Sequence, residues 1–533
     1  MPASISLSNI AWTTSDGRTL FSDLSLNFEG GRSGLVGRNG VGKSTLLHLI
    51  SGWLQPQAGK VSASGTLGLL RQAAQTSADE TVADLFGVAS GFDVLRRAEA
   101  GLADVDELAA ADWTLEARIA TALARVRLSA APDTRLSTLS GGQRTRVGLA
   151  ALVFGEPDFI LLDEPTNNLD RDGRMAVIDL LAGWRAGAIV VSHDRELLDT
   201  MDAIVELTSL GASRYGGNWS HYRGRKAIEL EAAEHDLLDA ERRVAQVARA
   251  TQATAERKAR KDGAGKRKAA RGDMPRILMN GLKNRAENTS GDNARLAERQ
   301  RVQAVADAAA ARERIEVLQS FAVKLPSTGL PSGKVVLRID GLTVGHEPGR
   351  PVISGFSLDI AGPERIAVSG GNGSGKTTLL KAISGALGPW EGRVEVMTGY
   401  AMLDQQVGLF DPSSSIRDNF RRINPDTDEN ACRSALARFM FRADAALQIV
   451  GSLSGGQLLR AGLACVLGGK VLPPLLILDE PTNHLDIDSI EAVEAGLRAY
   501  DGALLVVSHD ERFLDAIGIG RRIVLEKGSA TAR

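Results

Sequence analysis

Two glycine-rich segments have the residue types and spacing of a phosphate-binding loop. The first comprises Gly37, Arg38, Asn39, Gly40, Val41, Gly42, Lys43, Ser44 and Thr45, and the second comprises Gly370, Gly371, Asn372, Gly373, Ser374, Gly375, Lys376, Thr377 and Thr378. In such a loop, backbone N–H groups at a helix start surround phosphate oxygens, the lysine neutralises charge and the following hydroxyl can bind Mg²⁺. The glycines allow an approach that a Cβ would block. We therefore predict two nucleotide phosphate sites.

Hydrolysis of a bound nucleotide also requires a positioned metal ion and an oriented water molecule. The apolar segment 159–162 ends at Asp163 and Glu164, and the segment 188–191 is followed by His193. We expect Asp163 to position Mg²⁺ through water, Glu164 to act as general base, and His193 to contact the γ-phosphate. Gln72 suits a role in sensing metal and water. The corresponding residues later in the chain are Asp479, Glu480, His509 and Gln405.

Each of these residues would be unremarkable alone, because a charged loop or a polar surface explains it equally well. The two halves of the chain carry matching residues in the same order, and this favours the catalytic interpretation over a charged loop or a polar surface. The paired lysines and glutamines are 333 positions apart, and the serine, aspartate and histidine pairs are 314 to 316 apart. The chain is therefore a tandem duplication with about 19 extra residues in the first copy.

A second anion-binding segment follows in each copy. Leu139-Ser140-Gly141-Gly142-Gln143 opens one predicted helix, and Leu453-Ser454-Gly455-Gly456-Gln457 opens another. A helix start with two glycines can be a simple N-cap, or it can bind an anion. Because each copy already has its own phosphate loop, anion binding makes sense only if this segment faces the other copy's nucleotide.

Strands that alternate with helices predict an α/β fold with mostly parallel sheets. We expect a first nucleotide-binding domain at 1–221 with a helical insertion at about 79–130, a helical linker at 222–332, and a second nucleotide-binding domain at 333–533. The composition is that of a globular protein, with 43% hydrophobic residues, 24% charged residues and a net charge of −2. Two distant cysteines favour a reducing cytosol, and we expect neither a signal peptide nor a transmembrane helix.

The linker has its own pattern. Leu230, Leu237 and Val244 recur every seven residues, with Ala233, Ala240 and Val247 three further on, which predicts a closely packed helix seam. A returning partner is supplied by Ala297, Ala304, Ala308, Ala311, Ile315 and Leu318. Between them, residues 257–285 carry eleven Lys or Arg against two Asp, and their glycines predict a turn-rich basic tip. The tip could contact phosphates, or it could be a solvated loop. Residues 223–320 contain no aromatic side chain except histidine, which disfavours base stacking.

These motifs resemble the ATP-binding cassette superfamily. The segments LLDEPTNNLD (161–170) and LILDEPTNHLD (476–486), the long charged linker and the lack of a membrane segment resemble the ABC-F family specifically. The resemblance implies a head-to-tail pair of cassettes in one monomeric chain, with ATP and Mg²⁺ as cofactors. Lys43 and Ser44 would share one ATP with Ser454, Gly455 and Gly456, and Lys376 and Thr377 would share the other with Ser140, Gly141 and Gly142.

The chain departs from the family pattern in three places, one of which is that the extra segment in the first copy is short for an ABC-F arm. Asn168 stands where the family usually has the histidine seen at His484. The aromatic residue expected to stack on adenine is absent, with Thr14 at its position in the first copy, Trp12 nearby, and His346 in the second.

The family also implies a ribosomal partner, with the linker reaching rRNA or tRNA, and hence a cytoplasmic translation factor or an antibiotic-resistance protein. A transporter ATPase with separate membrane chains and a DNA-associated ATPase are the alternatives.

Overall fold

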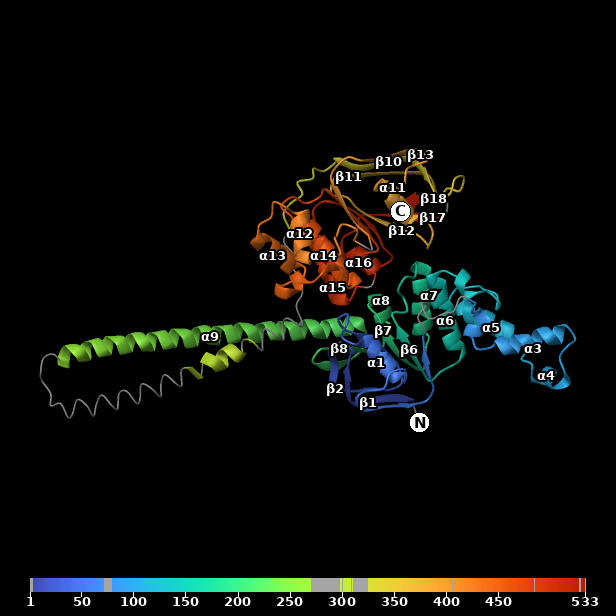
Figure 1. Ribbon diagram of the computed structural model, residues 1–533, viewed down its shortest axis with the longest axis horizontal. Coiled ribbons are helices and arrows are strands. Elements are labelled where there is room, and N and C mark those ends of the chain that lie inside the picture. The colour runs from blue at the N-terminus through green and yellow to red at the C-terminus, as the bar shows by residue number, and fades with distance from the viewer. Residues whose placement is uncertain are drawn as a thin grey trace. The chain divides into compact units, whose positions relative to one another are not determined.

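The computed structural model describes residues 3–70, 79–269, 298–299, 301–307, 309, 325–404, 407–483, 485–526 and 529–532. The chain divides into one compact unit of residues 1–220 and 321–533 and a second of residues 221–320. The first unit holds two copies of one architecture, here called the first repeat (β1–β9) and the second repeat (β10–β18). Figure 1 labels many of their elements.

The first repeat contains β1 (Ser4–Thr13), β2 (Thr19–Phe28), β3 (Arg32–Val36), α1 (Lys43–Ile50), β4 (Ala58–Ser64), β5 (Leu67–Leu69), α2 (Val82–Leu85), α3 (Ala89–Glu99), α4 (Val105–Ala110), α5 (Leu115–Arg125), α6 (Gly141–Phe154), β6 (Phe159–Asp163), α7 (Arg171–Ala182), β7 (Gly187–Val191), α8 (Arg195–Leu198), β8 (Ala203–Thr208) and β9 (Gly211–Gly216). A six-stranded sheet has the order β5-β6-β7-β3-β8-β9, and only its β8–β9 pair is antiparallel. A three-stranded antiparallel sheet has the order β2-β1-β4.

The second repeat contains β10 (Val335–Val344), β11 (Ile353–Ala361), β12 (Arg365–Ser369), α11 (Lys376–Ile383), β13 (Glu391–Val396), β14 (Tyr400–Leu403), α12 (Ile416–Ile423), α13 (Glu429–Arg438), α14 (Gly455–Leu467), β15 (Leu475–Asp479), α15 (Ile487–Ala499), β16 (Ala503–Val507), α16 (Glu511–Ala516), β17 (Arg521–Glu526) and β18 (Ser529–Ala532). Its sheets have the orders β14-β15-β16-β12-β17-β18 and β11-β10-β13. The predicted α/β class with mostly parallel sheets is confirmed in both repeats.

Strand register places the functional segments at one edge of each large sheet. In the first repeat, Val191 of β7 pairs with Leu35 of β3 on one side and with Asp163 of β6 on the other. Parallel strands end in the same direction. The loops that follow these three strands therefore leave the same edge of the sheet, and in the second repeat Val507 pairs with Val368 and Asp479 in the same way.

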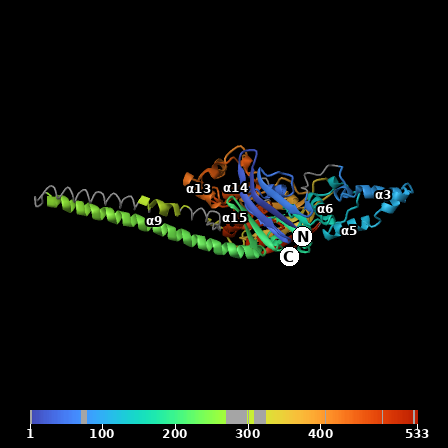
Figure 2. The ribbon, with the colours of Figure 1, turned by 90° about the horizontal axis from the view of Figure 1, so that it is seen from below.

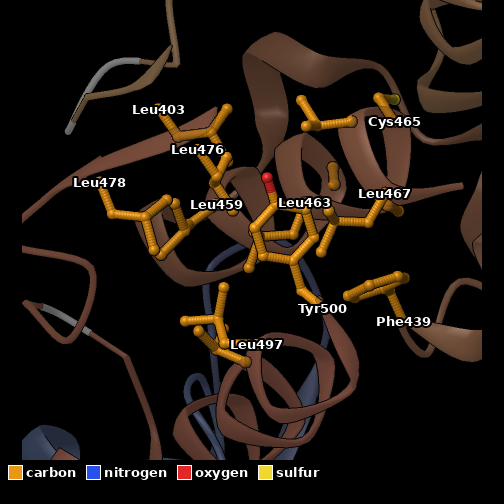
Figure 3. Packing of buried hydrophobic residues seen from close by; sticks show 14 of the residues in the cluster. Leu403, Phe439, Leu459, Leu463, Cys465, Leu467, Leu476, Leu478, Leu497 and Tyr500 are labelled. Carbon is orange, nitrogen blue, oxygen red and sulfur yellow. The ribbon is translucent and has the colours of Figure 1, made fainter. Parts of the chain in front are cut away.

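Apolar side chains from both faces of each sheet form the cores. Figure 3 shows one such cluster in the second repeat, where the Tyr500 ring packs among leucines from α14, β14 and β15. The Tyr500 hydroxyl donates to the carbonyl oxygen of Pro473, so the buried phenol is satisfied. Burial of this kind fixes the strands and hence the loops at their ends.

The insertion predicted at about 79–130 is helical, but it is divided into four short helices, α2 to α5. Figures 1 and 2 both show α3 projecting away from the large sheet of the first repeat. Leu102 and Val105 lie near the α3–α4 turn and are 70% and 81% exposed. Turns at Gly87 and Gly101, which adopt positive φ angles of 70° and 71°, separate some of these helices.

The second unit is dominated by α9 (Trp219–Ala269), a helix of 51 residues. The predicted seam is confirmed, since Leu230, Ala233, Leu237, Ala240 and Val244 are all buried or half-buried. The expected start of a turn-rich tip near Arg257 is wrong, because α9 continues through Gly263 and Gly265 as far as Ala269. Residues 270–285 of the tip lie outside the described residues, as do most of the proposed returning alanines; Ala304 is described and buried.

A packing difference between the repeats gives a testable prediction. Phe159 on β6 pairs with Gly187 on β7, whereas the second repeat has Leu475 paired with Ala503. A Cβ on Gly187 would lie 2.3 Å from a ring carbon of Phe159. We expect Gly187→Ala to destabilise the protein by about 1–3 kcal/mol through overpacking.

The second repeat supplies the matched rescue. The double variant Phe159→Leu/Gly187→Ala recreates its pair and should recover most of the lost stability in denaturant titrations. A double variant no more stable than Gly187→Ala would show that the ring does not cause the loss.

Candidate functional site

Both predicted phosphate loops connect a central strand to a helix. Gly42 and Gly375 are the N-cap residues of α1 and α11, with φ angles of 108° and 104° that favour glycine. A Cβ on Gly37 would lie 2.2 Å from the carbonyl oxygen of Leu207, so this position has no space for a larger residue. Ser44 and Thr377 are exposed, and their hydroxyls are therefore open to a ligand.

The two loop lysines are turned back onto their own loops. Lys43 Nζ donates to the carbonyl oxygens of Gly37 at 2.7 Å and Arg38 at 3.2 Å, and Lys376 Nζ makes the corresponding bonds to Gly370 and Gly371. Burial lowers the pKa of each lysine, while nearby carboxylates oppose this shift. Each ammonium therefore lies where a phosphate oxygen could replace a carbonyl.

Each glutamate predicted to act as general base lies next to the histidine predicted to contact the γ-phosphate, here called the switch histidine. His193 Nε2 is 3.3 Å from Glu164 Oε1, and His509 Nε2 is 3.4 Å from Glu480 Oε1. The two glutamates have φ angles of 48° and 46°, a region that residues with a Cβ seldom occupy. Backbone strain of this kind occurs preferentially at functional sites.

Burial changes the charge of both pairs. It raises the pKa of Glu164 to about 8 and that of Glu480 to about 7, with neighbouring aspartates adding to the effect and the loop lysines opposing it. Burial also lowers the pKa of His193 to about 3 and that of His509 to about 4. At neutral pH both histidines are therefore neutral, and both glutamates titrate close to the working range.

Residues of both repeats line one cavity of about 770 Å³ around the second phosphate loop. The second repeat contributes, among others, Lys376, Thr377, Asp479, Glu480 and His509, and the first contributes Asn168, Leu169, Arg174 and His193. His346 also lines this cavity, and its Nε2 is 3.2 Å from Thr378 Oγ1. The structure thus brings the predicted residues of the second site together with residues from the other repeat.

The two Leu-Ser-Gly-Gly-Gln segments, 139–143 and 453–457, open helices, as predicted. Ser140 caps α6 and exchanges hydrogen bonds with Gln143, and Ser454 and Gln457 do the same at α14. The Gln143 and Gln457 side chains are therefore engaged in capping. Gly142 lies beside Asn372 of the opposite phosphate loop, since a Cβ built on the glycine would be 3.7 Å from Asn372 Nδ2.

Two aspartates that the sequence reading did not select contact the opposite phosphate loops. Asp486 Oδ2 accepts a hydrogen bond from the backbone N–H of Asn39 at 2.9 Å, and Asp170 Oδ2 accepts one from Asn372 at 3.3 Å. Each aspartate is also the N-cap of the next helix, α15 or α7. Their matching places at the ends of the two quoted motifs were the available signal.

The donor set fits ATP with Mg²⁺. Glycine-lined helix starts, a lysine and a hydroxyl suit phosphates, and Asp163 or Asp479 with Ser44 or Thr377 would leave a metal ion several positions for water and phosphate oxygens, as Mg²⁺ prefers. Among the described residues, no cluster of three or more His, Cys, Asp or Glu side chains could hold a metal alone. Gln72, Gln405 and His484 lie outside the described residues.

The sequence matches known proteins over nearly its whole length. The family model described as ABC transporter matches residues 21–167 and 353–483. The tylosin resistance ATP-binding protein TlrC of Streptomyces fradiae is 33% identical, with 93% of each chain covered. The energy-dependent translational throttle protein EttA of Mycobacterium tuberculosis is 30% identical, with 93% of this chain and 87% of the relative covered.

Solved structures show the same fold. The RNase-L inhibitor aligns with a TM-score of 0.62 at 19% identity, covering 98% of this chain and 90% of that one. The archaeal ribosome recycling factor aABCE1, in its complex with ribosomal stalk protein aP1, also gives 0.62 at 18% identity, covering 98% and 89%. Within the described part of the chain, no helix has the length and apolar character needed to cross a membrane. This chain is an ATPase of the ATP-binding cassette superfamily and belongs to its ABC-F family.

Proposed function

We propose that the chain binds and hydrolyses ATP at two composite sites and acts on the ribosome. The observation that carries the first part is the buried glutamate–histidine pair beside a loop lysine in both repeats. A carboxyl with a pKa near neutrality is well suited to accept a proton from an attacking water molecule. Lys43 and Lys376 would exchange their carbonyl partners for phosphate oxygens, which concentrates positive charge where the γ-phosphate lies.

When bound, Mg²⁺ would neutralise charge on the nucleotide phosphates. Asp163 and Ser44 would hold it at the first site, and Asp479 and Thr377 at the second. Glu164 and Glu480 would orient the water and take its proton, while the neutral His193 and His509 would contact the γ-phosphate. The histidines remain uncharged at pH 7, so they can orient the glutamates without forming a full ion pair with them.

The contacts between the repeats support shared sites. Gly142 lies beside Asn372 of the second phosphate loop, and Asp170 accepts a hydrogen bond from the backbone N–H of Asn372. The first repeat therefore contacts the second phosphate loop. Asp486 makes the corresponding contact to Asn39. Ser140 and Ser454 open helices whose free N–H groups would face the nucleotide of the other repeat.

The ribosomal part of the proposal rests on relatives and on local charge. The relative EttA is an energy-dependent translational throttle protein, and one structural neighbour is a model of ribosome-bound archaeal Pelota and ABCE1. Residues 257–285 have a net charge of +9 in a chain whose overall charge is −2, and Arg257 and Arg260 are exposed on α9. A basic segment without aromatic residues suits contacts to the RNA backbone. The relative TlrC is a tylosin resistance ATP-binding protein. Antibiotic protection is therefore a candidate role of this chain, in addition to a housekeeping role in translation.

The proposed catalytic role predicts a specific pH dependence of ATP hydrolysis. Glu480→Gln should leave only the first site active, with kcat/KM rising through about pH 8, because Glu164 must lose its proton. Glu164→Gln should leave only the second site, with the rise near pH 7. The double variant Glu164→Gln/Glu480→Gln should hydrolyse ATP at least about 100-fold more slowly than the wild type.

Glu511→Gln is a matched control for this experiment. The Glu511 carboxylate is engaged by Arg171 across the repeats and by Arg522 of its own repeat, so the substitution should leave the pH profile of hydrolysis unchanged. A double Glu164→Gln/Glu480→Gln variant that hydrolyses ATP as fast as wild type would refute the assignment of both bases.

The proposed ribosomal partner predicts co-sedimentation. The double variant should bind ATP without hydrolysing it, and it should sediment with 70S ribosomes in sucrose gradients that contain ATP. Replacing the eleven basic residues of 257–285 with glutamine should release it, because phosphate contacts depend on charge.

Replacement of an equal number of exposed Lys and Arg residues elsewhere on the chain controls for net charge. A trapped variant that stays at the top of the gradient would refute the ribosomal proposal. Recovery with duplex DNA or with membrane chains would then support one of the two alternatives.

A further inference from the structure

Arg174 connects the segments that carry the two switch histidines. It lies in the first turn of α7, and its side chain is 10% exposed. Its Nη2 donates to Asp194 Oδ1 at 2.6 Å, and its Nη1 donates to the carbonyl oxygen of His509 at 3.0 Å. Asp194 directly follows His193, so one guanidinium spans from the first switch segment to the second.

The planar guanidinium is suited to this geometry. It carries several N–H donors in a fixed fork and remains charged, so it can hold a carboxylate and a carbonyl at the same time. Asp194 is buried with Arg174, and removing one partner would leave the other charge uncompensated. Glu196 lies 3.1 Å from the same nitrogen that contacts Asp194, which further fixes the orientation of the fork.

Asp194 fixes the arginine relative to the first site. Its Oδ1 accepts hydrogen bonds from the backbone of Glu196 and Leu197 and caps α8. A displacement of His193 toward a γ-phosphate would move the adjacent Asp194 and therefore the guanidinium. The carbonyl of His509 would lose or change its hydrogen bond as a result.

The second repeat has no counterpart to this arginine. Ile490 stands at the matching place in α15, is 2% exposed, and lines the same cavity. An isoleucine cannot donate a hydrogen bond to a switch segment. The link is therefore built from the first repeat alone.

We propose that Arg174 is a positioning residue that couples the two ATP sites through the backbone of His509. The proposal rests on the roles assigned above to the two histidines. It requires that occupation of one site changes the affinity or turnover of the other, and that this influence passes through the guanidinium.

Arg174→Met in the full chain tests the proposal, because methionine retains much of the volume without the charge. We would measure hydrolysis as a function of ATP concentration. The wild type should deviate from a Hill coefficient of 1, and Arg174→Met should return it to 1. In parallel, Glu480→Gln should change the KM of the first site by about fivefold or more in the wild type, as for ordinary coupling between sites. With Arg174→Met, the same substitution should change it less than about twofold.

Arg171→Ala is the matched control. Arg171 is in the same helical turn and contacts Glu511 of the second repeat, but its side chain is 67% exposed. Its loss should leave the Hill coefficient at the wild-type value. If Arg174→Met does not fold, Arg174→Lys carries the test, since an ammonium lacks the fork that spans Asp194 and the His509 carbonyl, and it should also move the coefficient toward 1.

Two results would overturn the proposal. One is a wild-type Hill coefficient of 1 with an unchanged KM in Glu480→Gln. The other is a folded Arg174 variant with wild-type coupling. Failure of the proposed catalytic glutamates is distinguishable, because Glu164→Gln and Glu480→Gln would then hydrolyse ATP normally while the Hill comparison would still decide the role of Arg174.

Discussion

The shared register of three parallel strands is the constraint on which the active centres depend. Val191 is hydrogen-bonded in register between β3 and β6, so the phosphate loop, the Asp163-Glu164 pair and the His193 segment must leave the sheet at the same level. A shift of one residue in β7 would turn His193 to the opposite face and remove it from Glu164. The cores on both faces of the sheet, which are almost fully buried, make such a shift costly.

Burial at that edge then sets the chemistry. A carboxyl group, an imidazole and an ammonium group are placed together in a region with little water, where each would be expensive to keep charged without a partner. The glutamates respond by holding a proton more tightly, and the histidines respond by releasing theirs. Both shifts reduce the charge that these glutamates and histidines carry at neutral pH.

The sequence predicted the parts of this arrangement that repeat as motifs. Lys43, Glu164 and His193 were recognised because each follows an apolar strand and recurs in order in the second half of the chain. Asp170 and Arg174 were not assigned a role, because their functions arise only when one repeat contacts the other. The continuation of α9 beyond Arg257 as far as Ala269 was also missed, because Gly263 and Gly265 suggested turns. Glycine lowers helix stability by about 1 kcal/mol per residue relative to alanine, which packing or neighbouring helix formers can offset.

The contacts between the two repeats have a consequence for how the protein works at low abundance. Several are exposed ion pairs, such as Arg38 with Asp488 and Arg171 with Glu511, and such pairs contribute only about 0–1 kcal/mol each. Two separate chains would need a larger or more apolar interface to stay together when dilute. Here both partners are covalently joined, so their effective concentration is set by the length of the connecting chain and not by the number of copies in the cell. Exposed ion pairs can therefore contribute to assembly here, although each adds little free energy.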